Sequence, residues 1–63
     1  MEFSEQVKKL RNKMILSQTE FAEVMEVTFA TVNRWENGRS KPTYKVLRRF
    51  VELCKQNGVD LEE

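Results

Sequence analysis

The sequence predicts an all-α fold, a compact bundle of about four to five short helices. Apolar residues at positions 3, 7, 10 and 14 recur with the spacing of one buried helical face. Hydroxyl-bearing residues that can cap helices precede the apolar stripes, and the Asn-Gly pairs at residues 37–38 and 57–58 are typical stop signals. Together these signals predict short helices joined by tight turns.

The chain has 63 residues, which favours one domain over residues 1–63 with a small core. Domains of this size need well-packed helices, disulfides, a metal or a partner subunit. Cys54 is the only cysteine and the chain contains no histidine, so neither an intrachain disulfide nor a structural zinc site can form. Helix packing and dimerisation remain, and no cofactor and no metal are expected.

The first helix is expected at residues 4–13. Ser4 is a good N-cap, and Glu5 suits the positive end of the helix dipole. The lysines of this segment face outward, where they are either simply solvated or close enough to touch phosphate.

In the middle of the chain the apolar spacing does not fit one continuous helix. Phe21, Ala22 and Met25, where a second helix should end, share one face, whereas Val32 and Trp35 form another with i, i+3 spacing. Two short helices joined by about three residues satisfy both faces. Ala22 would be small because the following helix crosses close to it.

Capping signals delimit these two helices. Ser17 and Glu20 fit a capping box at the start of the second helix. Thr28 is expected to N-cap the third helix, which should run to about Glu36. Gly38 then ends this helix in the left-handed conformation.

A fourth helix is expected at residues 43–56, with Thr43 as its cap. Val46 and Leu53 lie one turn round from the inner stripe of this helix. They form either a dimer interface together with the C-terminal tail or merely a wider core. The inner stripe is expected to consist of Leu47, Phe50, Val51 and Cys54.

Three stretches resemble the helix-turn-helix of the lambda-repressor-like family, also called the Cro/C-repressor or xenobiotic-response-element type. They are LSQTEFA, the Val27 after the turn, and TVNRWENGRSKP. The resemblance covers roughly residues 3–58, with the motif itself at about 18–37. Family members often have glycine at two turns where this chain has Ile15 and Glu26, and a non-glycine residue with positive φ costs on the order of 1 kcal/mol. These departures concern turn geometry and not the fold.

The net charge of +1 hides an uneven distribution. Residues 28–49 carry six basic residues against one acidic residue, a net charge of +5. The flanking segments are acidic, with −1 over residues 1–27 and −3 over residues 50–63. Positive charge concentrated on one segment is typical of a nucleic-acid site, although a solvated helix face would give the same pattern.

The resemblance implies that base-reading residues lie on the outward face of the third helix. Phe29 beside Ala30 could pack on thymine methyl groups, Arg34 could bind guanine bidentately, and Asn33 could bind adenine or phosphate. Structural alternatives exist, since Phe29 could pack inward against the turn and Arg34 could pair with a glutamate on another turn. The implied base-reading residues are Phe29, Ala30, Asn33 and Arg34.

The resemblance also implies a set of phosphate contacts. Gln18 lies at the start of a helix, where backbone N–H groups and the dipole favour an anion. Thr28 could serve only as a cap, and Arg39 and Lys41 could be merely solvated. The implied phosphate-contacting residues are Gln18, Thr28, Asn37, Arg39 and Lys41.

Four further residues have structural interpretations. Arg11 and Glu36 resemble the family's paired charges, which link the first helix to the end of the third. Trp35 is expected in the core, with its indole N–H at an edge or bound to a partner. Cys54 is expected to be a buried apolar filler, because no histidine is available to activate it.

The function implied by the resemblance is a sequence-specific, double-stranded DNA-binding transcriptional regulator of bacterial or phage type, acting as a repressor. The third helix would enter the major groove. A homodimer through the helix at residues 43–56 and the C-terminal tail is expected, because one such domain reads only a few base pairs. No apolar run approaches membrane length and no signal-peptide pattern occurs, so a cytoplasmic, nucleoid-associated protein is expected.

A second class of function stays open, a protein-interaction or antitoxin-like module. A variant is the detached N-terminal DNA-targeting domain of a longer protein, which the tail VDLEE, offering no further domain, does not exclude. An enzyme is not expected, since the chain has no histidine, no Gly-rich phosphate loop and no carboxylate pair placed in a pocket. No small-molecule ligand and no membrane partner are inferred.

Overall fold

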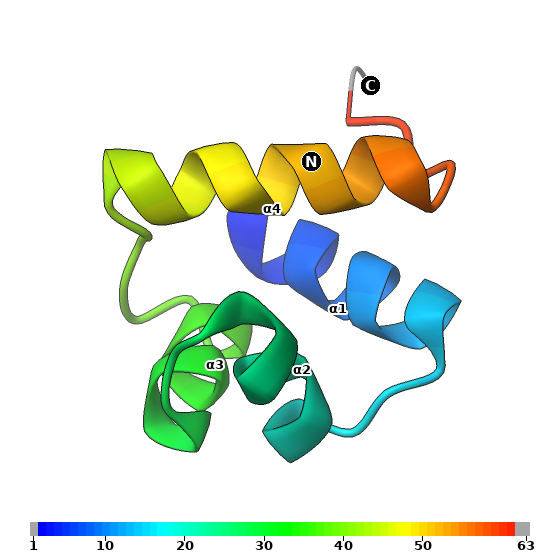
Figure 1. Ribbon diagram of the computed structural model, residues 1–63. Helices are drawn as coiled ribbons and strands as arrows, with labels where there is room; N and C mark the ends of the chain where they lie inside the picture. The colour runs from blue at the N-terminus through cyan, green and yellow to red at the C-terminus, as the bar shows by residue number, and fades with distance from the viewer. Residues whose placement is uncertain (1, 62–63) are drawn as a thin grey trace.

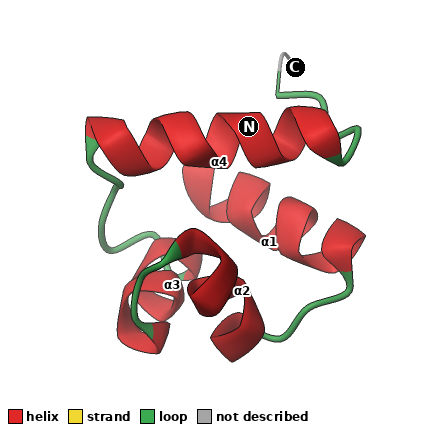
Figure 2. Ribbon diagram, viewed as in Figure 1, coloured by secondary structure: helices red, strands yellow, loops and turns green. Residues whose placement is uncertain are grey.

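The computed structural model describes residues 2–61, and the regular secondary structure of this part of the chain is entirely helical (Figures 1 and 2). In Figure 1, α4 runs across the top of the molecule, α1 lies beneath it, and α2 and α3 form the lower end. The predicted all-α bundle is confirmed. The four helices are α1 (Phe3–Met14), α2 (Gln18–Met25), α3 (Phe29–Glu36) and α4 (Tyr44–Gln56).

All four helices contribute to one core. Phe3, which lies at the edge of this core, places its ring edge-to-face against Trp35 at 5.6 Å and against Phe50 at 5.1 Å between ring centroids. Trp35 and Cys54 are buried, so both predictions are confirmed. The buried residues are Val7, Leu10, Phe21, Ala22, Met25, Val32, Trp35, Phe50, Cys54 and Val59.

Side-chain caps start three of the helices. Ser17 and Glu20 form the predicted capping box, with Glu20 N–H donating to Ser17 Oγ at 3.1 Å and Ser17 N–H donating to Glu20 Oε1 at 2.9 Å. Thr28 accepts from the N–H of Thr31 at 3.2 Å. Thr43 caps α4 in the same way, although its bond is longer at 3.4 Å. All three predicted caps are confirmed.

The prediction that Ser4 is an N-cap is wrong. The first helix begins at Phe3, and its N-cap position is Glu2, whose side chain makes no capping hydrogen bond. Starting the helix one residue earlier directs the Phe3 ring onto Trp35 and Phe50. Phe3 is half-buried, and its two edge-to-face ring contacts, each worth about 0.5–1.5 kcal/mol, together exceed the roughly 1 kcal/mol of a serine cap.

Each helix ends with the same hydrogen-bond pattern, the Schellman motif. At the end of α2, Val27 N–H donates to the carbonyl of Ala22 at 2.9 Å, and Glu26 N–H donates to that of Glu23 at 3.2 Å. The motif requires a left-handed residue at the end of each helix, and glycine occupies this position after only two of the four helices. The four left-handed residues are Ile15, Glu26, Gly38 and Gly58.

Ile15 and Glu26 accept this backbone strain because of the residue that follows each of them. Leu16 and Val27 both pack against the core. Ile15 is itself 87% exposed, so its side chain gains little from its position. The strain at each turn is therefore offset by burial of the next apolar side chain.

The structure bears on two expectations for α4. Val46 and Leu53 are half-buried and pack against the core, as the alternative of a wider core expects. Val51 is half-buried but is not part of the packing against the core, so its predicted place on the inner stripe is wrong. At about 100° per residue, Val51 lies on the same side of the helix as Tyr44, away from Phe50. Residues 62–63 of the tail, which the predicted interface included, lie outside the described residues.

The strained turns predict which substitutions stabilise the fold. Ile15→Gly should raise the free energy of unfolding by about 1 kcal/mol, and Glu26→Gly by about 0.5–1 kcal/mol, because glycine adopts positive φ without strain. Ile15→Gly should stabilise the fold more than Glu26→Gly, because positive φ strains a β-branched residue most. Thermal melts of the variants measure the effect. The matched control is Gly58→Ala, whose added Cβ would meet no atom within 4 Å, so its expected loss reports backbone conformation alone. Lower midpoints for both glycine variants would contradict the strain argument.

Candidate nucleic-acid interface

The outward face of α3 carries exposed side chains that the core does not use. Phe29 is 50% exposed and does not pack against the core, which argues against the inward alternative for this residue. Ala30 and Arg34 are exposed, and Asn33 is half-buried. Among residues 2–61, Arg34 forms no ion pair, so the alternative that it pairs with a glutamate is not observed.

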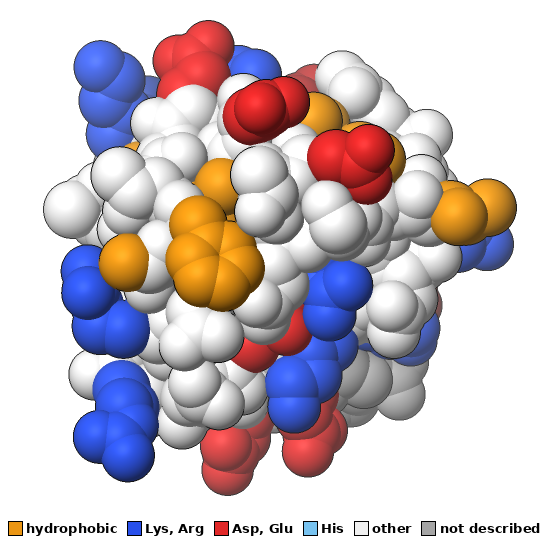
Figure 3. All heavy atoms as spheres, turned by 90° about the horizontal axis from the view of Figure 1, so that it is seen from below, with side chains coloured by type: hydrophobic (Ala, Val, Ile, Leu, Met, Phe, Trp, Pro, Cys, Tyr) orange, Lys and Arg blue, Asp and Glu red, His pale blue; other side chains and the backbone are white. Residues whose placement is uncertain are grey.

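Figure 3 views the molecule from below, so that α2 and α3 face the reader. Basic side chains lie along the left edge and near the centre, beside an exposed hydrophobic group. Most acidic side chains lie toward the top and bottom of this view, and a small acidic area adjoins the central basic group. The face of the helix-turn-helix therefore combines positive charge with apolar surface, as contact with phosphates and thymine methyl groups requires.

Arg11 and Glu36 form a two-pronged ion pair between α1 and the end of α3. Arg11 Nε donates to Glu36 Oε2 at 2.6 Å, and Arg11 Nη2 donates to Glu36 Oε1 at 3.1 Å. A third arginine nitrogen, Nη1, donates to the carbonyl of Leu16 at 3.1 Å. The pair therefore joins α1, the turn before α2, and α3.

The surroundings of Glu36 favour the ionised form of its carboxyl group. Its side chain is only 5% exposed, and burial by itself raises the pKa of a carboxyl group. Hydrogen bonds from Arg11 and Gln18, together with the charges of Arg11 and Lys8, outweigh burial, so the pKa of Glu36 lies below its ordinary value. Glu36 is therefore a carboxylate at neutral pH.

Gln18 belongs to the same hydrogen-bond network. Its Nε2 donates to Glu36 Oε1 at 2.9 Å, and its Oε1 accepts from Asn33 Nδ2 at 3.4 Å. Asn33 Oδ1 in turn accepts from Asn37 Nδ2 at 3.1 Å. The structure thus brings together Gln18, Asn33 and Asn37, which sequence reasoning had treated as separate DNA contacts.

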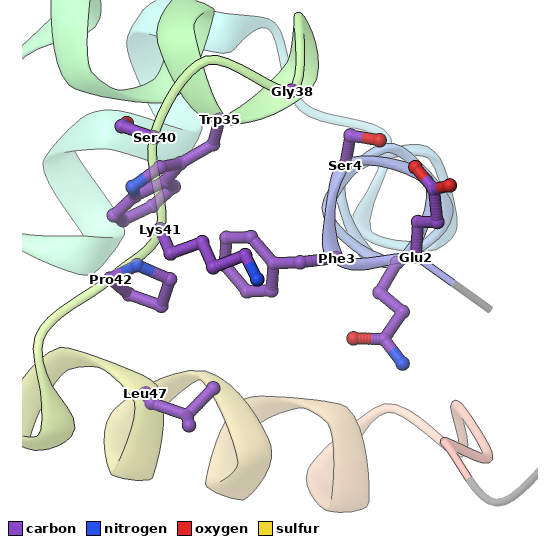
Figure 4. Close-up of a pocket in the computed structure, with 10 residues that line it drawn as sticks. Glu2, Phe3, Ser4, Trp35, Gly38, Ser40, Lys41, Pro42 and Leu47 are labelled. Atoms are coloured by element: carbon purple, nitrogen blue, oxygen red, sulfur yellow. The ribbon is translucent and has the colours of Figure 1, made fainter.

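The remaining predicted contacts lie at the two ends of α3. The hydroxyl of Thr28 bonds to the N–H and, at 2.9 Å, to the hydroxyl of Thr31, so it acts as a cap. Arg39 is exposed, and its N–H donates to the carbonyl of Arg34 at 2.9 Å. Lys41 is exposed on the connection to α4, and Figure 4 shows its side chain extending toward the ring of Phe3.

Lys41 lines a cavity of about 660 Å³ between the start of α1, the connection after α3, and α4 (Figure 4). Its lining residues are Glu2, Phe3, Ser4, Gln6, Trp35, Gly38, Ser40, Lys41, Pro42 and Leu47.

One positioning contact was missed by sequence reasoning. Arg49 of α4 donates from Nε and Nη2 to the carbonyl of Val24 near the end of α2, at 3.2 and 2.9 Å. Arg49 also lies 4.0 Å from the carboxylate of Glu26. No short-range sequence pattern predicts this contact, because the two partners are 25 residues apart in the chain.

A protein-family model described as Helix-turn-helix matches residues 7–63. The chain therefore belongs to this family, and specifically to its lambda-repressor-like, xenobiotic-response-element type. Membership supports a DNA-binding helix-turn-helix regulator. No curated protein and no solved structure gives a significant match to the chain. Within the described residues, every helix is too short or too polar to span a membrane.

The buried carboxylate predicts a pH-dependent stability difference. Glu36→Gln should lower the free energy of unfolding by about 1.5–3 kcal/mol at neutral pH, because it removes the charge from several charge-assisted hydrogen bonds. The pKa of Glu36 is lowered in the folded state, so this stabilisation is complete above the ordinary glutamate pKa and is lost as the pH falls through the folded value. Denaturant titrations across a range of pH measure the gap between the two proteins.

The matched control is Glu23→Gln, which makes the same change at an exposed position of α2 and should have little effect at any pH. A gap between Glu36→Gln and the unaltered protein that stays constant far into acid would contradict the assignment of a charged Glu36.

Proposed function

We propose that this protein is a sequence-specific, double-stranded DNA-binding transcriptional repressor of bacterial or phage type, with α3 in the major groove and α2 across the backbone. The observation that carries the proposal is the outward face of α3. Phe29, Ala30 and Arg34 are exposed there, while the buried face of α3 is fixed in the core by Val32 and Trp35. A rigid helix with unused contact groups is suited to reading base edges.

Phosphate contacts would come from both ends of the helix-turn-helix. Arg39 and Lys41 supply exposed charge after α3, and backbone N–H groups at the start of α2 supply an anion site near Gln18. Thr28 and Asn37, at the two ends of α3, would complete the set. The net charge of +5 over residues 28–49 supports a salt-dependent affinity for DNA. The protein would act in the cytoplasm, at the nucleoid, as a single non-enzymatic domain.

A homodimer would read a two-fold symmetric operator. The support for it comes from the side of α4 that carries Tyr44 and Val51, where Tyr44 is 83% exposed. With Leu47, these residues line a shallow hollow of about 650 Å³. Leu47 also lines the cavity beside Phe3, so the two hollows are neighbours that share this side chain. Arg49 faces α2 from another side of α4, so this surface lies away from α2.

Charge on the same surface fits a second copy of this chain. Arg48 and Glu52 line the hollow on α4, and among residues 2–61 neither forms an ion pair. If two α4 helices pack antiparallel about a two-fold axis near residue 50, Arg48 of one protomer lies opposite Glu52 of the partner subunit. The symmetry forms this pair twice, as an isologous interface requires.

The contrast between Arg34 and Lys41 tests the DNA-reading proposal. Arg34→Ala should cost about 1–3 kcal/mol on a duplex selected by the unaltered protein from a random pool, and much less on random duplex. Lys41→Ala should weaken both about equally and lower the salt slope by about one. Titrations of both duplexes at several salt concentrations measure the difference.

Equal loss on both duplexes for Arg34→Ala would make Arg34 a phosphate contact, and base reading would then rest on Phe29, Ala30 and Asn33. If neither substitution affects DNA binding, the regulator proposal fails and an interaction module takes its place.

Charge reversal tests the proposed dimer. Arg48→Glu and Glu52→Arg should each weaken self-association by roughly tenfold, because two exposed pairs of about 0.5–1 kcal/mol are lost. The combined variant should restore self-association. Analytical ultracentrifugation measures the association, with circular dichroism as a check on folding. Lys45→Glu is the control, an exposed position of α4 that does not line the hollow. A combined variant as dissociated as the single ones would place the interface elsewhere.

A further inference from the structure

Three amide side chains connect the buried Glu36 carboxylate to the outward face of α3. Gln18 is 2.9 Å from Glu36, Asn33 is 3.4 Å from Gln18, and Asn37 is 3.1 Å from Asn33. The chain of bonds runs from a buried residue through two half-buried ones to an exposed one. Its longest and weakest bond is the central one, between Gln18 and Asn33.

The carboxylate decides which way each amide faces. An ionised carboxylate can only accept hydrogen bonds, so the nitrogen of Gln18 must face Glu36. The oxygen of Gln18 then faces Asn33 and requires a donor, which orients the Asn33 nitrogen toward it. The Asn33 oxygen in turn accepts from Asn37. Without this anchor, an Asn or Gln amide can rotate by half a turn and exchange its donor for its acceptor.

The orientation matters because Asn33 keeps hydrogen-bonding capacity. Among the described residues, its nitrogen and its oxygen each have one partner, which leaves a second N–H and a second lone pair. Donor and acceptor together are what an Asn side chain uses to bind the edge of adenine. An amide already held in one orientation loses less conformational freedom on binding and discriminates against a base with the opposite pattern.

We propose that Gln18 is a positioning residue for base recognition: it transmits the orientation imposed by Glu36 to Asn33 and so determines how the Asn33 amide faces the DNA. The effect on base recognition rests on the proposed function. The relay itself, the hydrogen bonds from Glu36 through Gln18 and Asn33 to Asn37, exists in the free protein. The proposed role of Gln18 differs from a direct phosphate contact by its side chain, because it runs through the hydrogen bonds to Glu36 and Asn33 and not through a bond to the DNA.

The test replaces Gln18 with methionine, which keeps the length of the side chain and removes its amide. Gln18→Met should lower affinity for the selected duplex by roughly 5- to 100-fold, the range expected for one bidentate base contact, and leave random-duplex affinity unchanged. In an Asn33→Ala background, the same change should have no further effect, because Gln18 acts through Asn33. Gln56→Met is the matched control, an exposed glutamine at the end of α4.

A second readout needs no DNA. In the free protein, the side-chain amide NMR signals of Asn33 and Asn37 should shift in Gln18→Met and stay unchanged in Gln56→Met. Equal loss of affinity on both duplexes would make Gln18 a phosphate contact and overturn the inference, as would the absence of any effect. If the unaltered protein prefers no duplex, the proposed function fails. The NMR measurement tests the relay independently of DNA, and unchanged amide signals of Asn33 and Asn37 in Gln18→Met would show that the relay does not exist.

Discussion

The ion pair between Arg11 and Glu36 is the interaction on which the rest of the site depends. Glu36 is the only buried charged residue in the described part of the chain. A buried pair adds little net stability, because desolvation opposes the Coulomb attraction. Its effect is geometric: it fixes the end of α3 against α1, and through Leu16 it also holds the turn that leads into α2. The end of α3, the helix proposed to enter the major groove, is thus joined through Arg11 and Glu36 both to α1 and to the turn before α2.

The apolar core completes this attachment from the other side. Helices of eight residues, such as α2 and α3, are not stable alone in water, so their position must come from packing. Trp35 and Val32 anchor the inner face of α3, and the Phe3 ring lies against Trp35. The strained turns at Ile15 and Glu26 persist because each delivers an apolar residue to this core. Packing thus leaves the outward face of α3 free for contacts with a ligand.

Local signals explain why most of the fold could be predicted. A capping hydrogen bond joins residues three apart, and a Schellman motif is completed within six, so the caps Ser17, Thr28 and Thr43 and the stop at Gly38 are readable from short stretches. The errors at Ser4 and Val51 have a different origin. Both depend on which side chains meet in the core: Phe3 has to reach Trp35 for the helix to begin before Ser4, and the inner face of α4 is decided by what packs against it.

The sequence by itself determined the four helices, all of their ends except the start of α1, the buried Trp35 and the concentration of positive charge around α3, because each of these follows from composition or from neighbours within about one or two turns. Resemblance to a known family added the pairing of Arg11 with Glu36. Only the tertiary structure decided that Gln18 bonds to Glu36 and Asn33, 18 and 15 residues away, and that Arg49 bonds to the carbonyl of Val24. The physical reason is that these hydrogen bonds depend on how helices cross, and the crossing is set by the whole core and leaves no periodic trace in the chain.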